Sequence, residues 1–229
     1  MNNNRATATP PIRRTRSFVR RTGRITAGQQ RALDELWPHW GIQPPAGRLD
    51  LDTVFGRNAP RVLEIGFGNG DTLVRMAVAE PGIDFLGIEV HEPGVGHCLL
   101  GIEREGLTNL RVIRHDAVEV LENWLPANCL DRVQLFFPDP WPKKRHHKRR
   151  IVQPEFTDLV AMVLKPDGVF HVATDWANYA EHIEAVMEPD PRFSRMDGEQ
   201  RRFETRFEQR GRRLGHTIRD LQYRYRPQG

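Results

Sequence analysis

Short apolar runs alternate with amphipathic stretches between residues 60 and 187. The runs have the length of buried strands, and the amphipathic stretches have the period of helices. The predicted strands are 61–65, 84–89, 110–114, 132–136 and 169–174. The predicted helices are 71–79, 94–105, 117–124, 153–164 and 177–187. Repeated strand–helix units predict an α/β fold, with a mostly parallel central sheet and helices on both faces.

The pattern changes on either side of this repeat. Residues 27–40 carry apolar side chains on one helical face, and 51–55 predict a short strand or turn. Residues 217–225 alternate with a period of two, which predicts an antiparallel C-terminal strand. We therefore expect a single α/β domain over 27–229, preceded by a flexible basic arm over 1–26.

Length and composition favour a cytoplasmic protein. No apolar run approaches the ~20 residues of a membrane span, and the N-terminus lacks the apolar stretch of a secretory signal. Cys98 and Cys129 are isolated in the sequence, which fits a reducing compartment and argues against a structural zinc site. We expect no metal, no membrane and no obligate protein partner.

The positive charge lies in two blocks. Residues 1–24 hold seven arginines and no acid, and residues 143–150 hold six cations and no acid. Since the net charge is +4, the rest of the chain carries 4 − 13 = −9. A solvated tail explains one such block, but two blocks on an acidic body favour a nucleic-acid partner.

The loop at 137–150 combines an acid with the second basic block. Its sequence is FPDPWPKKRHHKRR, and it directly follows a predicted strand. Three prolines fix φ and remove backbone donors, which predicts a stiff loop outside any helix or sheet. A rigid Asp139 followed by cations indicates a polyanion presented to a reactive pocket.

Three glycines follow the first strand of the repeat. Glu64 precedes Gly66, Gly68 and Gly70, and Asp71 stands where a dinucleotide fingerprint has its third glycine. A carboxylate there would repel a pyrophosphate, so the spacing favours S-adenosylmethionine over NAD. A tight strand-to-helix turn is the alternative explanation.

Acids also follow the next two strands. Glu89 is placed to accept hydrogen bonds from ribose hydroxyls, and Asp116 to accept one from an adenine amino group. Asp116 with Glu119 also has the spacing of a helix capping box, and the two roles are compatible. Because the carboxyl ends of parallel strands form the ligand edge of such sheets, these acids strengthen the prediction of S-adenosylmethionine.

Asp139 and Asp175 follow the last two strands of the repeat. Each has an alternative role, Asp139 as a turn residue and Asp175 as a helix cap. If both face the pocket, their carboxylates can accept from the N–H groups of a base such as guanine. Ser17 and Ser194, the only serines, lie outside any nucleophile elbow, and neither cysteine has a nucleophile's setting.

The sequence resembles the bacterial tRNA (guanine-N(7)-)-methyltransferases. The stretches that carry the resemblance are 16–30, 64–70, 87–96, 115–120, 136–152, 171–176 and 205–215. It implies a Rossmann-like class I methyltransferase fold, S-adenosylmethionine as cofactor and tRNA as partner. The implied reaction is methyl transfer to ring nitrogen 7 of a guanine in the tRNA variable loop. Pro142 and residues 197–204 depart from the family pattern.

The resemblance also implies residue roles. Glu64, Glu89, Asp116 and Asp139 correspond to cofactor contacts, and Asp139 to the catalytic position. The implied substrate and RNA contacts are Lys143, Arg145, His146, His147, Lys148, Arg149, Arg150, Asp175, Thr205, Arg206, Phe207 and Glu208.

Three other functions share parts of this pattern. An exocyclic-amine methyltransferase is the nearest, because Asp139-Pro-Trp-Pro approaches the motif of those enzymes, although a basic run follows here. A non-catalytic RNA-binding module is disfavoured by the intact glycines and strand-end acids. An NAD oxidoreductase is disfavoured by Asp71.

Overall fold

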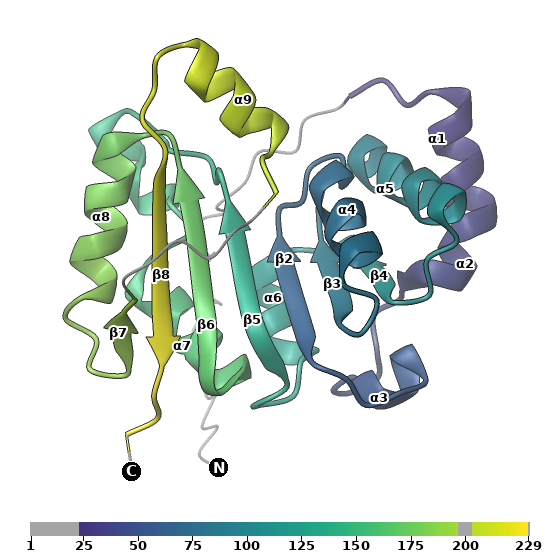
Figure 1. The fold of residues 1–229 in the computed structure, drawn as a ribbon, viewed down its shortest axis with the longest axis horizontal. Coiled ribbons are helices and arrows are strands. Elements are labelled where there is room, and N and C mark those ends of the chain that lie inside the picture. Colours follow the sequence, from purple (N-terminus) through teal and green to yellow (C-terminus); the bar gives the residue numbers. More distant parts are fainter. Residues whose placement is uncertain (1–22, 197–202, 229) are drawn as a thin grey trace, which may run out of the picture.

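The computed structural model describes residues 23–196 and 203–228 (Figure 1). One eight-stranded sheet runs through the described chain in the order β1-β4-β3-β2-β5-β6-β8-β7. The strands are β1 (Gly41–Ile42), β2 (Arg61–Ile65), β3 (Asp84–Ile88), β4 (Leu110–Ile113), β5 (Leu130–Phe136), β6 (Leu164–Thr174), β7 (Phe193–Arg195) and β8 (Arg219–Tyr225). Neighbours from β1 to β6 pair in parallel, and β8 is antiparallel to both β6 and β7. The predicted sheet is confirmed, whereas the short strands β1 and β7 were not predicted.

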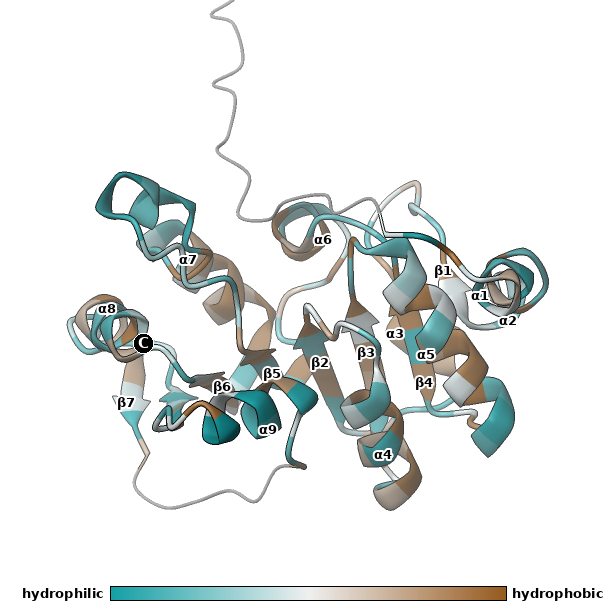
Figure 2. Ribbon diagram, turned by 90° about the horizontal axis from the view of Figure 1, so that it is seen from above, coloured by the Kyte–Doolittle hydropathy of each residue, from teal (hydrophilic) through white to brown (hydrophobic). Residues whose placement is uncertain are grey.

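Helices cover both faces of the sheet. They are α1 (Ala27–Arg31), the π-helical η1 (Ala32–Leu36), α2 (Trp37–Trp40), α3 (Leu51–Phe55), α4 (Asp71–Ala79), α5 (Glu92–Glu105), α6 (Ala117–Asn123), the 3-10 helix η2 (Lys144–Arg149), α7 (Pro154–Val163), α8 (Ala177–Met187) and α9 (Arg206–Arg213). Viewed from above, α4 and α5 lie on one side of the strands, and α6 and α7 on the other (Figure 2). None of the helices formed by the described residues is both long and apolar enough to cross a membrane.

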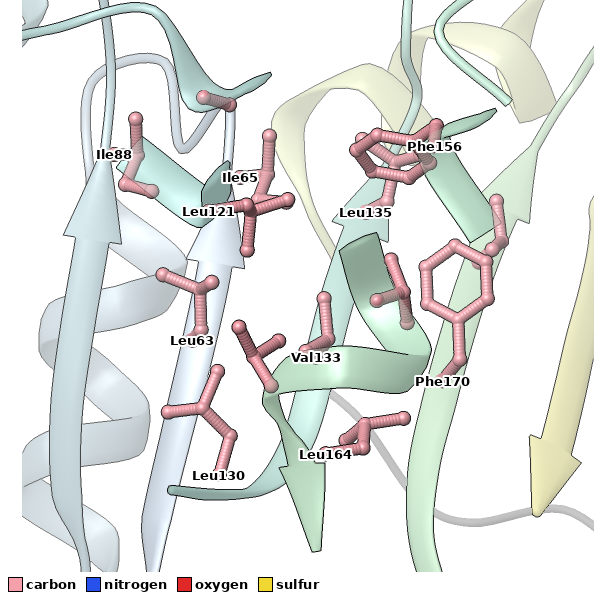
Figure 3. Close-up of a cluster of buried hydrophobic side chains, with 14 of the residues drawn as sticks. Leu63, Ile65, Ile88, Leu121, Leu130, Val133, Leu135, Phe156, Leu164 and Phe170 are labelled. Carbon is pink, nitrogen blue, oxygen red and sulfur yellow. The ribbon is translucent and has the colours of Figure 1, made fainter. Parts of the chain in front are cut away.

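Apolar side chains point alternately to the two faces of the sheet and form two hydrophobic cores. In β2, Leu63 and Ile65 point into the larger core, where they join side chains of α6 and α7 (Figure 3). Val62 points to the opposite face, into the core formed with α4 and α5. Leu63 is fully buried, and truncating such a leucine costs about 2–5 kcal/mol. Both faces of β2 are therefore held rigidly, which fixes the loop after this strand.

The prediction of a strand or turn at 51–55 was wrong, because these residues form α3. The Asp50 carboxylate caps the helix by accepting from the backbone N–H groups of Asp52 and Thr53, at 3.1 and 3.3 Å. Gly56 ends it in the left-handed conformation, at φ 71°. A five-residue segment is too short for its apolar period to separate helix from strand.

Two further helices differ from the predictions. Residues 144–149 form η2, so the expectation that the whole basic loop lies outside a helix was wrong. The prolines that stiffen the loop end at Pro142 and do not restrain the backbone of the basic run after it. Helix α9 was missed because it is too hydrophilic to present an apolar stripe. Its start did carry a signal, since the Thr205 hydroxyl accepts from Glu208 N at 3.1 Å, as the spacing Thr-x-x-Glu indicates.

Most of the predicted N-terminal arm, 1–26, lies outside the described residues. Its last four residues lead directly into α1. Thr26 and Gln29 cap this helix reciprocally, through Gln29 N to the Thr26 hydroxyl at 3.2 Å and Thr26 N to the Gln29 side chain at 3.0 Å. Gly23 and Ile25 line a cavity at the carboxyl ends of the central strands, so this end of the arm borders that cavity.

Candidate cofactor and substrate site

A cavity of about 1060 Å³ opens at the carboxyl ends of the central strands. Strand β2 pairs with β3 on one side and β5 on the other, so the chain reverses direction across the sheet at this point. Ligands of open α/β sheets bind at such switch points. The cavity brings together all the residues predicted to hold the cofactor, which are Glu64, Gly66, Gly68, Gly70, Glu89, Asp116 and Asp139.

The loop after β2 needs its three glycines. Gly66, Gly68 and Gly70 have φ values of 73°, 62° and 77°, in the left-handed region that L side chains rarely adopt. A Cβ on Gly70 would also lie 2.5 Å from the Cys98 sulfur. The glycine spacing therefore serves both a sharp turn and close packing against α5, and it leaves the loop backbone exposed to the cavity.

Glu89 organises the same loop. Its Oε2 accepts from Gly68 N at 2.8 Å, and its Oε1 accepts from Val90 N at 2.7 Å and His91 N at 2.9 Å. The carboxylate thus holds the glycine loop beside the end of β3. Three of the four acceptor sites of the carboxylate are thus used, and Oε2 keeps one for a contact such as a ribose hydroxyl.

Glu64 is the buried acid of the site. Its side chain is 3% exposed, and its Oε2 has no hydrogen-bond partner within the described chain. Burial, with a smaller contribution from the nearby Glu89 charge, raises the pKa of Glu64 to about 8. A buried, unpartnered carboxyl oxygen at the wall of a cavity is costly unless a ligand donor reaches it. The amino group of S-adenosylmethionine is such a donor, so the residues present fit this cofactor.

Asp116 serves as a helix cap at the third strand end. Its Oδ1 accepts from Val118 N at 2.9 Å at the start of α6. Glu119 does not complete the predicted box, because its carboxylate lies 2.6 Å from His115 Nε2 instead. Capping uses Asp116 Oδ1 and leaves the residue at the cavity wall, where the predicted adenine contact would form.

Asp139 stands on a strained loop at the end of β5. Its side chain is exposed and lines the cavity. Phe137 and Trp141, on either side of it, have φ values of 52° and 46°. Aromatic residues rarely adopt this region, and such strain concentrates at functional sites. Phe137 N donates to Ala173 O at 2.7 Å, which ties the loop to β6.

The basic loop divides into exposed and buried cations. Lys143, Lys144, Arg145 and Lys148 are exposed on the surface beside the cavity. Arg150 is 2% exposed instead, and donates to Pro140 O at 3.0 Å and to Asn178 Oδ1 at 2.7 Å. Its guanidinium therefore holds the base of the loop, a structural role that the sequence pattern did not indicate.

Aromatic and histidine side chains complete the basic loop. The Arg149 guanidinium lies 4.9 Å from the centroid of the Trp141 ring, and His146 meets the same ring edge-on. Desolvation and the surrounding cations lower the pKa of His146. A lower pKa favours a neutral ring near neutral pH, so the charge of this surface rests on its lysines and arginines. His147 Nε2 accepts from Arg150 Nη2 at 3.2 Å.

Helix α9 crosses the carboxyl edge of the sheet above β6 (Figure 1). At its C-terminal end, His216 Nδ1 lies 2.9 Å from Asp175 Oδ2, and a Cβ on Gly211 would meet the same oxygen at 2.9 Å. At its first residue, Arg206 Nε lies 3.1 Å from Asp71 Oδ2. These contacts join the helix and the residues that follow it to Asp71, at the start of α4, and to Asp175, directly after β6.

These contacts place the remaining predicted residues. Thr205, Arg206 and Phe207 line the cavity. Asp175 does not line it and does not cap α8, whose N-cap is Trp176. Glu208 is 5% exposed and accepts from Arg212 Nη2 at 2.8 Å. Asp175 therefore contacts His216, just after α9, and Glu208 forms an ion pair with Arg212 within the helix.

Sequence reasoning missed two contributors to this arrangement. Asp71 was interpreted only as a residue that repels pyrophosphate, whereas it pairs with Arg206 across 135 sequence positions. His216 was not singled out at all. No local pattern signals such pairs, because each depends on how α9 returns over the sheet.

Both cysteines of the chain are buried. Burial raises the pKa of both Cys98 and Cys129, so neither thiol is ionised near neutral pH. Within 23–196 and 203–228, no group of three His, Cys, Asp or Glu side chains is placed to hold a metal ion.

Comparison with known proteins identifies the family. The tRNA (guanine-N(7)-)-methyltransferase of Halorhodospira halophila is 57% identical over 223 residues, which cover 94% of this chain and 96% of that protein. The chain belongs to the tRNA (guanine-N(7)-)-methyltransferase family. The enzyme of the same name from Alkalilimnicola ehrlichii is 56% identical and covers 97% of both chains. A family model described as a putative methyltransferase matches residues 58–221.

Solved structures confirm the methyltransferase fold of this family member. The 16S rRNA methyltransferase KamB superposes with a TM-score of 0.55 at 16% identity, covering 79% of this chain and 95% of that one. The aminoglycoside resistance methyltransferase NpmB1 gives 0.54 at 18% identity, covering 77% and 92%. The Rossmann-like class I prediction is therefore confirmed at the level of the fold.

Proposed function

We propose that this chain transfers the methyl group of S-adenosylmethionine to ring nitrogen 7 of a guanine in the tRNA variable loop. Because the chain belongs to this family, one structural observation is enough to support the proposal. One cavity is lined both by the exposed Asp139 and by Glu64, whose Oε2 has no hydrogen-bond partner among the described residues. The exposed cations lie in the loop between Asp139 and Ile151, which both line this cavity. A cytoplasmic location, where tRNA is available, belongs to the same proposal.

Each of three strand-end acids would bind a different group of the cofactor. Glu64 would hold the amino group, Glu89 the ribose hydroxyls and Asp116 the adenine amino group. When bound, S-adenosylmethionine supplies a methyl group on a sulfonium centre. The glycine loop leaves room for the cofactor. Gly66 lines the cavity without a Cβ, and a Cβ built there would extend into open space.

Asp139 acts on the guanine side of the same cavity. Ring nitrogen 7 has a lone pair and carries no proton, so the reaction needs no general base. What remains for the protein is to position the base and to stabilise the positive charge that develops on it. The Asp139 carboxylate would do both, by accepting from the base edge and by its own negative charge.

The exposed cations of the basic loop would bind tRNA phosphates. If about four phosphates are neutralised, the log–log salt slope of tRNA binding is expected to be roughly −3, an eightfold loss of affinity per doubling of salt. Replacing Lys143, Lys144 and Lys148 together by alanine should flatten this slope by about 2. Fluorescence anisotropy of labelled tRNA over a salt series measures it.

Lys165 provides the matched control for that measurement. It pairs with Asp131 at 2.8 Å and lies at the beginning of β6, far from the carboxyl edge. Lys165→Ala should leave the slope unchanged. A wild-type complex that does not respond to salt would contradict the electrostatic part of the proposal.

Methyl transfer to an unmodified tRNA transcript tests the function itself. We expect label from S-adenosylmethionine to enter the transcript, and cleavage selective for N(7)-methylguanosine to cut it in the variable loop. Cleavage at another loop would contradict the substrate position. Label that enters without any selective cleavage would favour the exocyclic-amine alternative, and cofactor binding without label would favour a non-catalytic RNA-binding module.

A further inference from the structure

Two phenylalanine rings face each other across the reacting end of the cavity. Phe137 directly follows β5 and Phe207 is the second residue of α9, and both line the cavity together with Asp139. Their ring centroids are 6.4 Å apart, and their planes are inclined by only 19°. A planar group that contacts a ring on each side needs about 7 Å between the rings, because each carbon contact takes about 3.5 Å. The rings are therefore nearly parallel, and their centroid distance is slightly less than the spacing that a base requires.

Each ring carries an independent sign of ligand binding. Phe137 adopts a φ of 52°, which is unfavourable for an aromatic residue and is held by its backbone bond to Ala173. Phe207 is 57% exposed and lines the same cavity, so much of its side chain is accessible to a ligand. The cavity thus has an exposed ring from α9 and an aromatic residue with a strained backbone after β5.

Helix α9 fixes the exposed ring. The Arg206–Asp71 ion pair holds the first residue of the helix, and the His216–Asp175 contact holds the other end. Phe207 is therefore kept over the glycine loop, where its ring lies 3.8 Å from the position of a Cβ on Gly68.

We propose that Phe137 and Phe207 form a slot that stacks on both faces of the purine base of the substrate nucleotide. This inference rests on the proposed function and adds to it the mode of base recognition. A base in a folded RNA leaves its neighbours before it reaches the methyl donor, and stacking on aromatic side chains replaces the contacts that it loses. Asp139, on the same wall as Phe137, then meets the edge of a base whose plane the two rings define.

Substitutions at Phe207 test the slot, with methyl transfer to unmodified tRNA transcript as the assay. Phe207→Leu keeps apolar volume and removes the aromatic face, so kcat/KM should fall about 10- to 100-fold. Phe207→Trp keeps an aromatic face and should stay within about threefold of wild type. The matched control is Leu214→Ala, because Leu214 is an equally exposed apolar residue at the other end of α9, 63% exposed.

Cofactor affinity, measured by calorimetry on the same variants, separates the possible results. The slot predicts an unchanged Kd for S-adenosylmethionine in all of them. It is overturned if Phe207→Leu matches wild type, if Phe207→Trp loses as much as Phe207→Leu, or if the loss in kcat/KM equals the loss in cofactor affinity. Failure of the wild-type protein to methylate tRNA would instead overturn the proposed function on which the slot rests.

Discussion

Replacing Asp139 by alanine is expected to lower turnover on tRNA by about 100- to 1000-fold, the usual cost of removing one group that stabilises transition-state charge. The side chain is exposed at the cavity wall, on a loop in which Phe137 and Trp141 both have positive φ values. Because the nucleophilic nitrogen needs no base, the loss should appear in the single-turnover rate constant and should show no new pH dependence. Asp139→Asn keeps the shape and the acceptor oxygen but removes the charge, so it should retain an intermediate rate.

Two controls make the Asp139 result specific. Glu155→Ala removes an exposed acid at the start of α7, outside the cavity lining, and should leave turnover unchanged. Thermal unfolding of the Asp139 variants should match wild type, because an exposed loop carboxylate contributes little to stability. Near-normal turnover of Asp139→Ala would reduce Asp139 to the turn residue that its sequence context also allows.

The cofactor half of the site could be predicted from sequence because its determinants are local. Each acid lies at or shortly after the end of a strand, and the sheet brings the carboxyl ends of parallel strands to one edge. Glu64, Glu89 and Asp116 therefore converge in the cavity without any knowledge of side-chain packing. The pattern could not indicate which hydrogen bonds each acid forms. Glu89 holds three backbone N–H groups, whereas Glu64 keeps an oxygen without a partner in the described chain.

The substrate half was less predictable because it depends on long-range packing. Arg150 belongs to a run of cations, and only the fold shows that its guanidinium is buried against Asn178 and Tyr179. Asp175 follows a strand like the cofactor acids, yet α9 covers it through His216. Helix α9 itself has almost no apolar residues, so periodicity gives no sign of it. Its position is set by ion pairs between residues far apart in sequence.

Replacing Glu64 by glutamine is expected to weaken S-adenosylmethionine binding and to stabilise the cofactor-free protein. Truncating the charged partner of a buried hydrogen-bonded pair costs about 2–5 kcal/mol, which is roughly 30- to 5000-fold in Kd. The stability gain arises because burial raises the pKa of Glu64 from 4.5 to about 8. The same carboxyl group thus favours binding and disfavours the empty fold.

The pH dependence of stability follows from that pKa. Below pH 4.5 the carboxyl is protonated in both folded and unfolded chains, so it does not affect the free energy of unfolding. Between pH 4.5 and about 8 the unfolded chain releases the proton while the folded, cofactor-free chain retains it, so the free energy of unfolding falls as pH rises. Glu64→Gln lacks this titration. It should exceed wild type by about 2–4 kcal/mol at pH 8 and match it near pH 4 in urea denaturation.

Cofactor binding should have the opposite pH dependence in the wild-type protein. The amino group of the cofactor needs the ionised carboxylate, so affinity should rise between pH 6 and 7.5, while an α-amino group with a pKa of about 7.7–8.0 remains largely protonated. The glutamine variant should bind weakly and with little pH dependence over this range. Glu181→Gln, which alters an exposed glutamate on α8, is the control and should change neither property. Equal pH dependence of affinity in wild type and Glu64→Gln would show that the proton released on binding comes from another group, and Glu64 would then not be the residue that holds the amino group.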